Sequence, residues 1–300
     1  MRIMITGASG YFGQLLAQRL RDDLGADTEI IGIDIREAGD TPQEMRFLEG
    51  DTRKKRIEDI FKVQDQIDTV IHLARDATPG LPSDKSMMTN VYGTAHMLEL
   101  ALKYKVKQFI FPSASIVYGA HRDNPALIHE CHPLLGNRDV ANIRDRVEAD
   151  MICQSFSNNT RMKVVILRIV PIWRAQGNGM LQRYMKHDLV PTLMGYDPMF
   201  QIIYEEEVLE AFSLTVRNPK AFGAYNIRGR VFMPLSKVIK ELGKTPVPLP
   251  EPLVHKKGRF RWSENVRFDF NYLKYPFCVD GDRARRELKY RPEEITITRV

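Results

Sequence analysis

Three glycines near the N-terminus have the spacing of a loop that binds phosphate groups. The sequence TGASGYFG at residues 6–13 follows the apolar run 2–5 and precedes apolar residues at helical spacing. A buried strand that turns through glycines into a helix directs free N–H groups and the positive end of the helix dipole at one spot, which favours a pyrophosphate. Gly7 can form the turn, Gly10 leaves room for the phosphates, and Gly13 permits close packing of helix on strand.

An acidic residue follows where the ribose of a dinucleotide would be recognised. A second apolar strand, residues 29–33, ends in Asp34, 21 residues after Gly13. A carboxylate at this place accepts hydrogen bonds from the ribose hydroxyls and repels a 2′-phosphate. The pattern therefore predicts dinucleotide binding, with NAD in preference to NADP, and Arg36 is the feature that would favour NADP. The alternative, an ordinary tight turn at residues 6–13, gives no reason for Asp34.

Three further groups of polar residues could take part in binding. The run 129–132 (HECH) resembles a metal cluster, but no additional ligands with zinc-like spacing accompany it, so no metal is predicted. The run 205–207 (EEE) fits the solvated first turn of a helix. Trp173 and Arg174 follow an apolar strand, where they could stack on a ligand and bind an anion or simply pack.

These residues need a scaffold in which strands and helices alternate. Apolar strands are expected at 45–51, 69–74, 108–113 and 163–170, with helices near 53–63, 84–104 and 140–157. Apolar strands separated by helices predict a parallel sheet that is covered on both faces and built from right-handed crossovers. The expected fold class is therefore α/β, a Rossmann-type doubly wound parallel sheet.

The pattern changes after about residue 170. Helical segments near 178–188, 205–217 and 234–242 are interrupted by short apolar pieces such as 224–227, and prolines crowd 246–252. We therefore expect a dinucleotide-binding domain at 1–170 and a smaller, mixed α/β substrate lobe at 171–300. The lobe should lie over the carboxyl ends of the strands, with chain crossing between the two parts.

Composition limits the classes of function. The chain has 300 residues, 43% of them hydrophobic, and a net charge of +6 that fits a solvated surface better than nucleic-acid binding. No apolar run approaches the length of a membrane span, and the first strand begins too early for a signal peptide. Three scattered cysteines (Cys131, Cys153, Cys278) are typical of a reduced cytoplasmic protein. A soluble cytoplasmic protein with no membrane or nucleic-acid partner is expected.

Further motifs occur in a recognisable order. The glycine loop and Asp34 are followed by GD at 50–51, HLA at 72–74, NVYGT at 90–94 and VYG at 117–119. Later come LRIVP at 167–171, segments at 200–201 and 206–208, YNI at 225–227 and DRARREL at 282–288. Taken together, the chain resembles the extended short-chain dehydrogenase/reductases, and within them the nucleotide-sugar epimerases and dehydratases. The resemblance runs nearly from end to end.

The resemblance implies a set of residues that line an NAD site. Asp51 would bond the adenine edge, residues 73–75 would line the cofactor near the nicotinamide ribose, and Asn90 would lie on the central helix behind the active site. The full set implied for the cofactor is Gly7, Ser9, Gly10, Tyr11, Phe12, Gly13, Asp34, Ile35, Arg36, Asp51, Thr52, Leu73, Ala74, Arg75, Asn90, Ser113, Arg144 and Ile172.

The catalytic positions of the resembling family have lost their usual groups. That chemistry needs a serine or threonine after the fifth strand and a Tyr-x-x-x-Lys pair on a helix, in which the lysine lowers the pKa of the tyrosine. Counting from the VYG motif and from Glu148, these positions hold Ala114, Val140 and Arg144. Arginine keeps a cation but cannot be tuned as lysine can. No tyrosine occurs between Tyr118 and Tyr184, so no shifted alignment restores the pair.

Two functions remain open from the sequence. One is an NAD-dependent enzyme that acts on a nucleotide sugar or related small molecule by a departed mechanism, with the loop 120–139 supplying an acid or base. The other is a non-catalytic dinucleotide-binding sensor or scaffold. Apolar stripes on the helices near 84–104 and 140–157 also predict a homodimer, as the resemblance implies, although burial within one chain is the alternative. The candidate loop residues are His121, His129, Glu130, His132 and Asp139.

Overall fold

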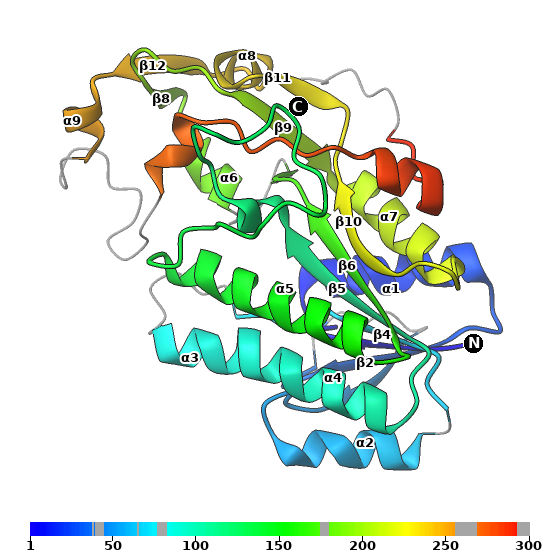
Figure 1. Ribbon diagram of the computed structural model, residues 1–300. Coiled ribbons are helices and arrows are strands. Elements are labelled where there is room, and N and C mark those ends of the chain that lie inside the picture. The colour runs from blue at the N-terminus through cyan, green and yellow to red at the C-terminus, as the bar shows by residue number, and fades with distance from the viewer. Residues whose placement is uncertain are drawn as a thin grey trace.

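A seven-stranded parallel sheet forms the centre of the computed structural model, which describes residues 1–37, 39, 45–64, 66–76, 83–174, 180–255 and 269–292 (Figure 1). The strands lie in the order β10-β6-β5-β4-β1-β2-β3. The order reverses between β1 and β4, and in open α/β sheets ligands bind at the carboxyl ends of the strands beside such a point. The strands are β1 (Arg2–Thr6), β2 (Glu29–Asp34), β3 (Met45–Glu49), β4 (Thr69–His72), β5 (Gln108–Ala114), β6 (Lys163–Ile169) and β10 (Gly223–Ile227).

The sheet is buried on both faces because its strands are apolar at successive positions. Ile3 and Ile5 of β1 belong to one hydrophobic cluster, whereas Met4 between them belongs to another on the opposite face. The same alternation holds in β6, where Val165 and Val164 enter different clusters. Successive side chains of a strand point to opposite faces, so an uninterrupted apolar run requires a cover on each side.

Helices provide these two covers. α1 and α7 pack against each other on one face, and α4 and α5 pack against each other on the other, with α2 beside α4 (Figure 1). The single helix expected near 84–104 is divided by a π-helical turn at Met88–Tyr92. The covering helices are α1 (Tyr11–Leu24), α2 (Glu58–Val63), α3 (Ser83–Met87), α4 (Gly93–Lys103), α5 (Ala141–Asn159) and α7 (Glu205–Arg217), with 3-10 turns at Lys55–Ile57 and Ser115–Tyr118.

A smaller part of the chain lies over the carboxyl ends of the main strands (Figure 1). It contains a three-stranded sheet in the order β11-β9-β7 and the parallel pair β12-β8. Its elements are β7 (Ile172–Trp173), α6 (Met180–Tyr184), β8 (Leu189–Leu193), β9 (Met199–Tyr204), β11 (Val231–Pro234), α8 (Leu235–Glu241), β12 (Thr245–Leu249), α9 (Glu251–His255), a 3-10 turn at Phe270–Leu273 and a π-helical turn at Ala284–Leu288.

One segment expected in the smaller lobe lies elsewhere. Residues 224–227 belong to β10, which pairs in parallel with β6 at the edge of the main sheet. The preceding helix α7 packs on α1 and returns the chain to this sheet, where Tyr225 and Ile227 are fully buried. The chain after residue 170 therefore serves both parts, and the two-domain division stays a prediction with a boundary that the chain crosses.

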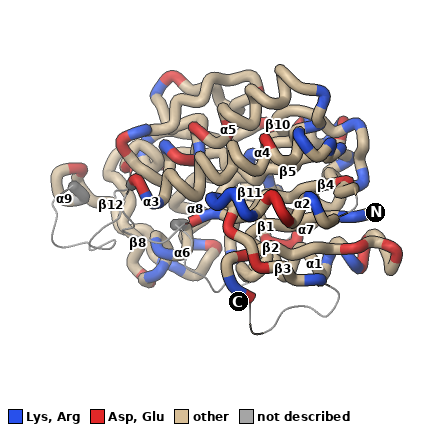
Figure 2. The backbone as a smooth tube through the Cα atoms, turned by 90° about the horizontal axis from the view of Figure 1, so that it is seen from below, with Lys and Arg blue, Asp and Glu red and all other residues tan. Residues whose placement is uncertain are grey.

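The apolar stripes of the two central helices divide between core and surface. Leu98 and Val147 are buried within the chain, whereas Met88 and Met151 are 47% and 44% exposed. The exposed members leave the predicted homodimer face uncovered in one chain. No helix in the described part of the chain combines the length and the apolar character that crossing a bilayer requires. Lys and Arg are interspersed with Asp and Glu around the molecule (Figure 2).

Candidate functional site

The glycine loop has the close approaches that the sequence predicts. Gly7 has a φ of +73°, and a Cβ there would lie 2.8 Å from the backbone nitrogen of Ala74. A Cβ on Gly13 would lie 2.5 Å from the carbonyl oxygen of Gly7. Gly10 is different, because it has an ordinary φ of −70° and a Cβ there would meet only the Gly7 oxygen, at 3.2 Å. The fold thus requires glycine at positions 7 and 13. It does not require glycine at position 10, where the missing side chain keeps the space in front of α1 open.

Asp34 ties the end of β2 to this loop. Its Oδ2 accepts the backbone N–H of Ser9 at 3.1 Å, and its Oδ1 accepts that of Ile35 at 2.8 Å. The hydroxyl of Ser9 donates to the carbonyl oxygen of Arg36 at 2.6 Å. These bonds hold the carboxylate at the rim of the loop. They also hold Ile35 and Arg36 beside it, and the cofactor contacts of these two residues stay a prediction.

The smaller lobe reaches the glycine loop through Tyr11. The Tyr11 hydroxyl donates to Glu205 Oε2 at 2.9 Å, and this bond raises the pKa of the phenol. The Arg174 guanidinium lies 5.1 Å from the centre of the Tyr11 ring, and its Nη1 is 3.4 Å from Glu205 Oε1. The sequence left the role of Arg174 open and assigned Glu205 to a solvated helix turn, because no local pattern joins residues so far apart.

The other two glutamates of the run 205–207 differ in exposure, and the predicted cofactor residues Phe12 and Ile172 contact other parts of the protein. The run 205–207 does begin a helix, but only Glu206 is largely solvated, since Glu207 is buried and accepts the backbone N–H of Tyr204 at 2.8 Å. Phe12 packs on Phe212 of α7, with ring centres 5.7 Å apart. Ile172 lies in β7, and its carbonyl oxygen accepts Gln182 at 3.0 Å.

A buried histidine joins the glycine loop to the end of β4. His72 Nδ1 lies 2.7 Å from Thr6 Oγ1, which also accepts the backbone N–H of Ala74 at 3.2 Å. His72 Nε2 lies 3.2 Å from Thr94 Oγ1 on α4. Burial lowers the pKa of His72 to about 3, so the ring is neutral near pH 7. This chain of contacts fixes residues 73 and 74 against Gly7.

His72 should make stability depend on pH. Between the ordinary pKa of 6.5 and the folded value of about 3, the unfolded chain binds a proton that the folded protein does not. The free energy of unfolding should therefore be unaffected above pH 6.5 and fall as the pH is lowered, by about 1.4 kcal/mol per pH unit. Urea unfolding of wild type and His72→Asn at pH 7.5 and pH 5 measures this. Between pH 7.5 and pH 5, the free energy of unfolding should fall by about 2 kcal/mol more in wild type than in His72→Asn. An equal fall in both proteins would contradict the expectation.

Asn90 brings the end of β4 together with helix α5. Its Oδ1 accepts the backbone N–H of Asp76 at 2.8 Å, and its Nδ2 donates to the carbonyl oxygen of Asp76 at 3.1 Å and to Asp145 Oδ2 at 3.2 Å. Ser86 donates to the same Asp145 oxygen at 2.7 Å. Asn90 lies in the π-helical turn, a departure from α-helix that often occurs at functional sites.

Arg144 binds Asp145, and the charge of Asp145 also acts on Arg75. Arg144 Nε and Nη2 donate to Asp145 Oδ1 at 3.1 and 2.6 Å, and the Asp145 side chain is 1% exposed. Arg75 is open to solvent, yet the protein around it lowers the pKa of its guanidinium by desolvation, while Asp145 and then Asp76 act against this. Within the described ranges no group forms a hydrogen bond or ion pair with Arg75.

β5 ends with Ser113 and Ala114, and Ser115 begins the 3-10 turn that follows. Ala114, at the position that the sequence predicts to correspond to the family's serine or threonine, has only a methyl side chain. The Ser113 hydroxyl is buried and donates to Asp150 Oδ2 at 2.6 Å, so only the backbone of Ser113 is available to a cofactor. Ser115 is also buried, and its hydroxyl has no partner within the described ranges.

Asp150 belongs to a buried ionic network that supports this strand end. Arg168 Nε and Nη2 donate to Asp150 at 3.0 and 2.9 Å, and Arg168 Nη1 donates to the Tyr118 hydroxyl at 2.8 Å. Burial raises the pKa of Tyr118 to about 12, so this phenol cannot act as a base near neutral pH. The network joins β5, α5 and β6, and sequence reasoning did not find it.

Helix α5 begins with the two remaining positions of interest. Val140 precedes the first helical residue and packs on the core, so it offers nothing that can titrate. Arg144 follows one turn later and is held by Asp145 as described. At the two positions that the sequence predicts to correspond to the family's tyrosine and lysine, this chain has a hydrocarbon side chain and a cation bound by Asp145.

The candidate residues of loop 120–139 are engaged separately. His121 Nε2 lies 2.9 Å from the Leu135 carbonyl oxygen, and His129 Nδ1 lies 2.9 Å from Asp280. Glu130 Oε1 accepts the backbone N–H of Asn226 at 2.9 Å. Within the described ranges, no group of three or more His, Cys, Asp or Glu side chains could hold a metal. A role for His132 or Asp139, or for these three, as a substitute acid or base stays a prediction.

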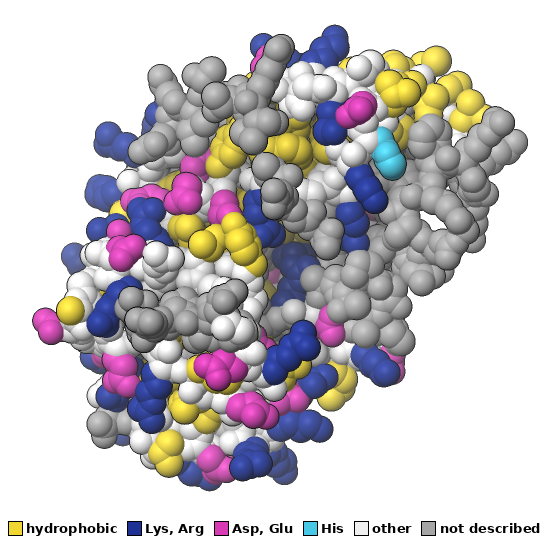
Figure 3. Space-filling model, turned by 180° about the vertical axis from the view of Figure 1, so that it is seen from behind, with side chains coloured by type: hydrophobic (Ala, Val, Ile, Leu, Met, Phe, Trp, Pro, Cys, Tyr) yellow, Lys and Arg dark blue, Asp and Glu magenta, His cyan; other side chains and the backbone are white. Residues whose placement is uncertain are grey.

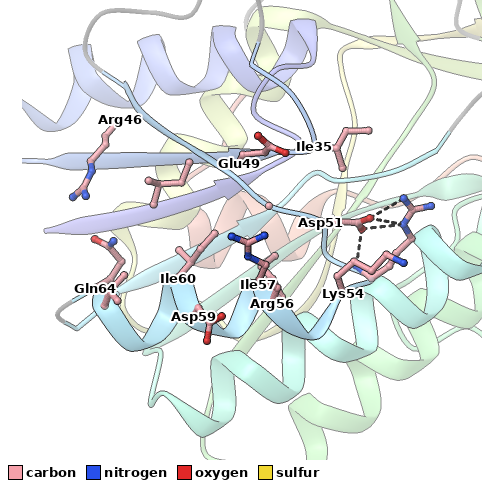
Figure 4. Close-up of a pocket in the computed structure, with 14 residues that line it drawn as sticks. Ile35, Arg46, Glu49, Asp51, Lys54, Arg56, Ile57, Asp59, Ile60 and Gln64 are labelled. Atoms are coloured by element: carbon pink, nitrogen blue, oxygen red, sulfur yellow. Dashed lines mark hydrogen bonds and ion pairs between the residues drawn. The ribbon is translucent and has the colours of Figure 1, made fainter.

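A separate hollow of about 650 Å³ opens at the β3 edge (Figure 4). Ile57 and Ile60 of the α2 region form apolar lining, and Ile35 and Asp51 contribute from the strand ends. Arg53 donates to both oxygens of Asp51, and dashed lines in Figure 4 mark these bonds. The bonds lower the pKa of Asp51. Thr52 is buried behind it. The adenine contact predicted for Asp51 stays a prediction. In the sheet, β2, β1 and β4 lie between β3 and β5, the strand that ends in Ala114.

A family model described as "NAD dependent epimerase/dehydratase family" matches residues 3–227. An uncharacterised protein of Mycobacterium tuberculosis is 26% identical, with 98% of this chain and 81% of that protein covered.

Solved structures share the fold over almost the whole chain. The UDP-glucose 4-epimerase of Thermotoga maritima with UDP-glucose has a TM-score of 0.75 at 20% identity and covers 99% of this chain and 95% of its own. The dTDP-glucose 4,6-dehydratase DesIV of Streptomyces venezuelae with NAD bound has a TM-score of 0.73 at 19% identity, with 98% and 92% covered.

Proposed function

Because this chain belongs to the NAD-dependent epimerase/dehydratase family, we propose that it binds NAD at the glycine loop and a nucleotide sugar or related small molecule beneath the smaller lobe. One observation carries the cofactor proposal. Gly7 and Gly13 allow approaches that no other residue could make, while Gly10 leaves the N-terminus of α1 open beside Asp34. A helix N-terminus with free N–H groups suits a pyrophosphate, and a carboxylate at the next strand end suits a ribose diol.

The residues present fit a dinucleotide in these terms. When bound, the nicotinamide supplies a hydride acceptor and donor. The protein's own groups would bind and orient it: backbone N–H groups of residues 11–13 at the start of α1 toward the phosphates, Asp34 toward the adenosine ribose, and Arg144 toward the nicotinamide ribose. Asp51, Thr52 and the hollow at the β3 edge would receive the adenine. Leu73, Ala74 and Ile172 would line the remainder, with Asn90 behind them.

NAD is expected to stabilise the protein more than NADP. Asp34 would face a 2′-phosphate with like charge, and a ligand that binds only the folded state raises the melting temperature by mass action. Thermal unfolding with NAD and NADP at equal concentrations measures the preference. Asp34→Asn should reduce it, and Asp22→Asn, an exposed change within α1, should leave it unchanged. A larger shift with NADP would assign the decisive role to Arg36.

The chemistry after binding divides into two proposals. The first is an enzyme that acts on its sugar substrate by a mechanism without the family's tyrosine. The second is a non-catalytic protein that senses cofactor state or supports a partner, and Val140, Ala114 and the fixed Arg144 favour it because none of them moves a proton near pH 7. A cytoplasmic homodimer, joined through α4 and α5, completes the proposal.

A further inference from the structure

We propose that Arg174, the residue that follows β7, is a further binding residue for the cofactor and donates to the pyrophosphate in front of α1. This inference rests on the proposed function and deepens it, because it adds a charged side chain to a phosphate site otherwise made of backbone N–H groups. It starts from the contacts that Arg174 and Glu205 make with Tyr11, the first residue of α1.

Strand pairing places Arg174 beside the start of α1. β7 and β9 run parallel, with Trp173 opposite Tyr204. The next residue of each segment, Arg174 or Glu205, therefore lies beside the other, and Arg174 Nη1 is 3.4 Å from Glu205 Oε1. Glu205 begins α7, and α7 packs on α1. The pairing of two short strands thus brings a guanidinium from the smaller lobe to the glycine loop.

The Tyr11 ring holds this guanidinium at the first turn of α1. The Arg174 guanidinium carbon lies 5.1 Å from the centre of the ring, close enough for a cation–π contact. The Tyr11 hydroxyl donates to Glu205 at 2.9 Å, so the ring itself is held in place. Tyr11 directly follows Gly10, where the missing side chain keeps the space in front of α1 open. The cation is therefore next to the space proposed for the pyrophosphate.

The hydrogen-bonding capacity of Arg174 is left for a ligand. Arginine has five N–H donors, yet Arg174 donates to no residue that the structure describes, and its Nε is buried without a partner among them. Arg168, by comparison, donates through Nε and both terminal nitrogens to other protein groups. The Arg174 side chain is 29% exposed, so its outer N–H groups can be reached. A ring and one carboxylate thus orient the guanidinium without using its donors.

The local charges favour a phosphate at this place. Glu205 alone would repel an anion at the start of α1, and Arg174 offsets this repulsion. A pyrophosphate carries a negative charge on each phosphate, and the planar N–H groups of arginine suit phosphate oxygens. Lys and Arg side chains gather around the hollow at the centre of the face seen from behind, which favours an anionic ligand there (Figure 3). Glu205 and the pyrophosphate therefore compete for the same guanidinium.

Two substitutions with opposite expected effects test the inference. Arg174→Gln should weaken NAD binding about tenfold, because a hydrogen bond to a charged group is worth about one such factor. Glu205→Gln keeps an acceptor for Tyr11 but removes the competing charge, and should strengthen NAD binding about two- to fivefold, as expected for an exposed ion pair. Isothermal titration calorimetry measures both affinities. Arg217→Gln, an exposed arginine at the end of α7, is the matched control and should bind NAD as wild type does.

The remaining outcomes decide against the inference or against its premise. Weaker NAD binding in both variants would show that the Arg174–Glu205 pair only supports the fold, and unchanged NAD binding in Arg174→Gln would also overturn the inference. Titration with UDP tests the other source of a diphosphate. Loss of UDP binding with unchanged NAD binding would assign Arg174 to the substrate. Glu205→Gln decides alone if Arg174→Gln does not fold, since only competition predicts tighter binding. Failure of wild type to bind NAD would instead defeat the proposed function.

Discussion

Gly10→Asp is expected to reduce NAD affinity by at least about 100-fold while the protein stays folded. The backbone at Gly10 has an ordinary conformation, and a Cβ there meets only one carbonyl oxygen, so the sheet and α1 should form. The new carboxylate, however, would stand at the N-terminus of α1, where the pyrophosphate is proposed to lie. It would repel the phosphates and interact with the positive end of the helix dipole in their place. Isothermal titration with NAD, accompanied by circular dichroism, measures both parts.

Gly10→Ala separates the charge from the added volume. It introduces the same Cβ, 3.2 Å from the Gly7 oxygen, without the carboxylate, and should therefore lose much less affinity. Gly13→Ala gives the opposite control, because its Cβ would lie 2.5 Å from the Gly7 oxygen and 2.8 Å from Ala8 Cα. Gly13→Ala should therefore be less stable than wild type even without NAD. Normal NAD binding by a folded Gly10→Asp protein would show that the cofactor lies elsewhere.

Turnover of UDP-glucose or dTDP-glucose by the wild-type protein is expected to be slower than in a family member with the full catalytic set, by a factor of about 10² to 10⁴. General acid–base catalysis by the tyrosine contributes a factor of that size. Val140, at the predicted tyrosine position, has no proton to give. Arg144 keeps its positive charge but cannot lose its proton as lysine can, and Asp145 already binds it. NAD binding should persist, since none of these changes alters the glycine loop. Chromatographic product assays with saturating NAD measure the rate.

Restoring the missing groups tests this explanation. Ala114→Ser, Val140→Tyr and Arg144→Lys together should raise the rate above wild type, whereas Val140→Phe with the other two changes supplies the ring without the hydroxyl and should not. Rapid turnover by the unmodified protein, lost when His121 or Glu130 is replaced, would show that loop 120–139 has taken over proton transfer. Rapid turnover that survives those replacements would place the active site elsewhere.

The sequence alone determined the main sheet and the cofactor loop because both follow local rules. Apolar β-branched runs separated by amphipathic helices admit few arrangements, and a glycine loop between strand and helix has one geometry. The steric demands on Gly7 and Gly13 agree with their predicted roles, and Asp34 lies beside Ser9. The family resemblance could also be found in this way, since its motifs are short and lie at strand ends.

Tertiary structure decided the contacts between segments far apart in the chain. The Tyr11–Glu205 bond, the Asp150–Arg168 pair and the placement of residues 224–227 in the main sheet have no local signal in the sequence. The same holds for Asn90, which joins the loop of Arg75 to Asp145. Local periodicity fixes which residues face inward, but which buried polar group meets which depends on the packing of whole elements. For this reason the sequence could predict where the catalytic positions lie, whereas only the fold shows which buried polar groups surround them.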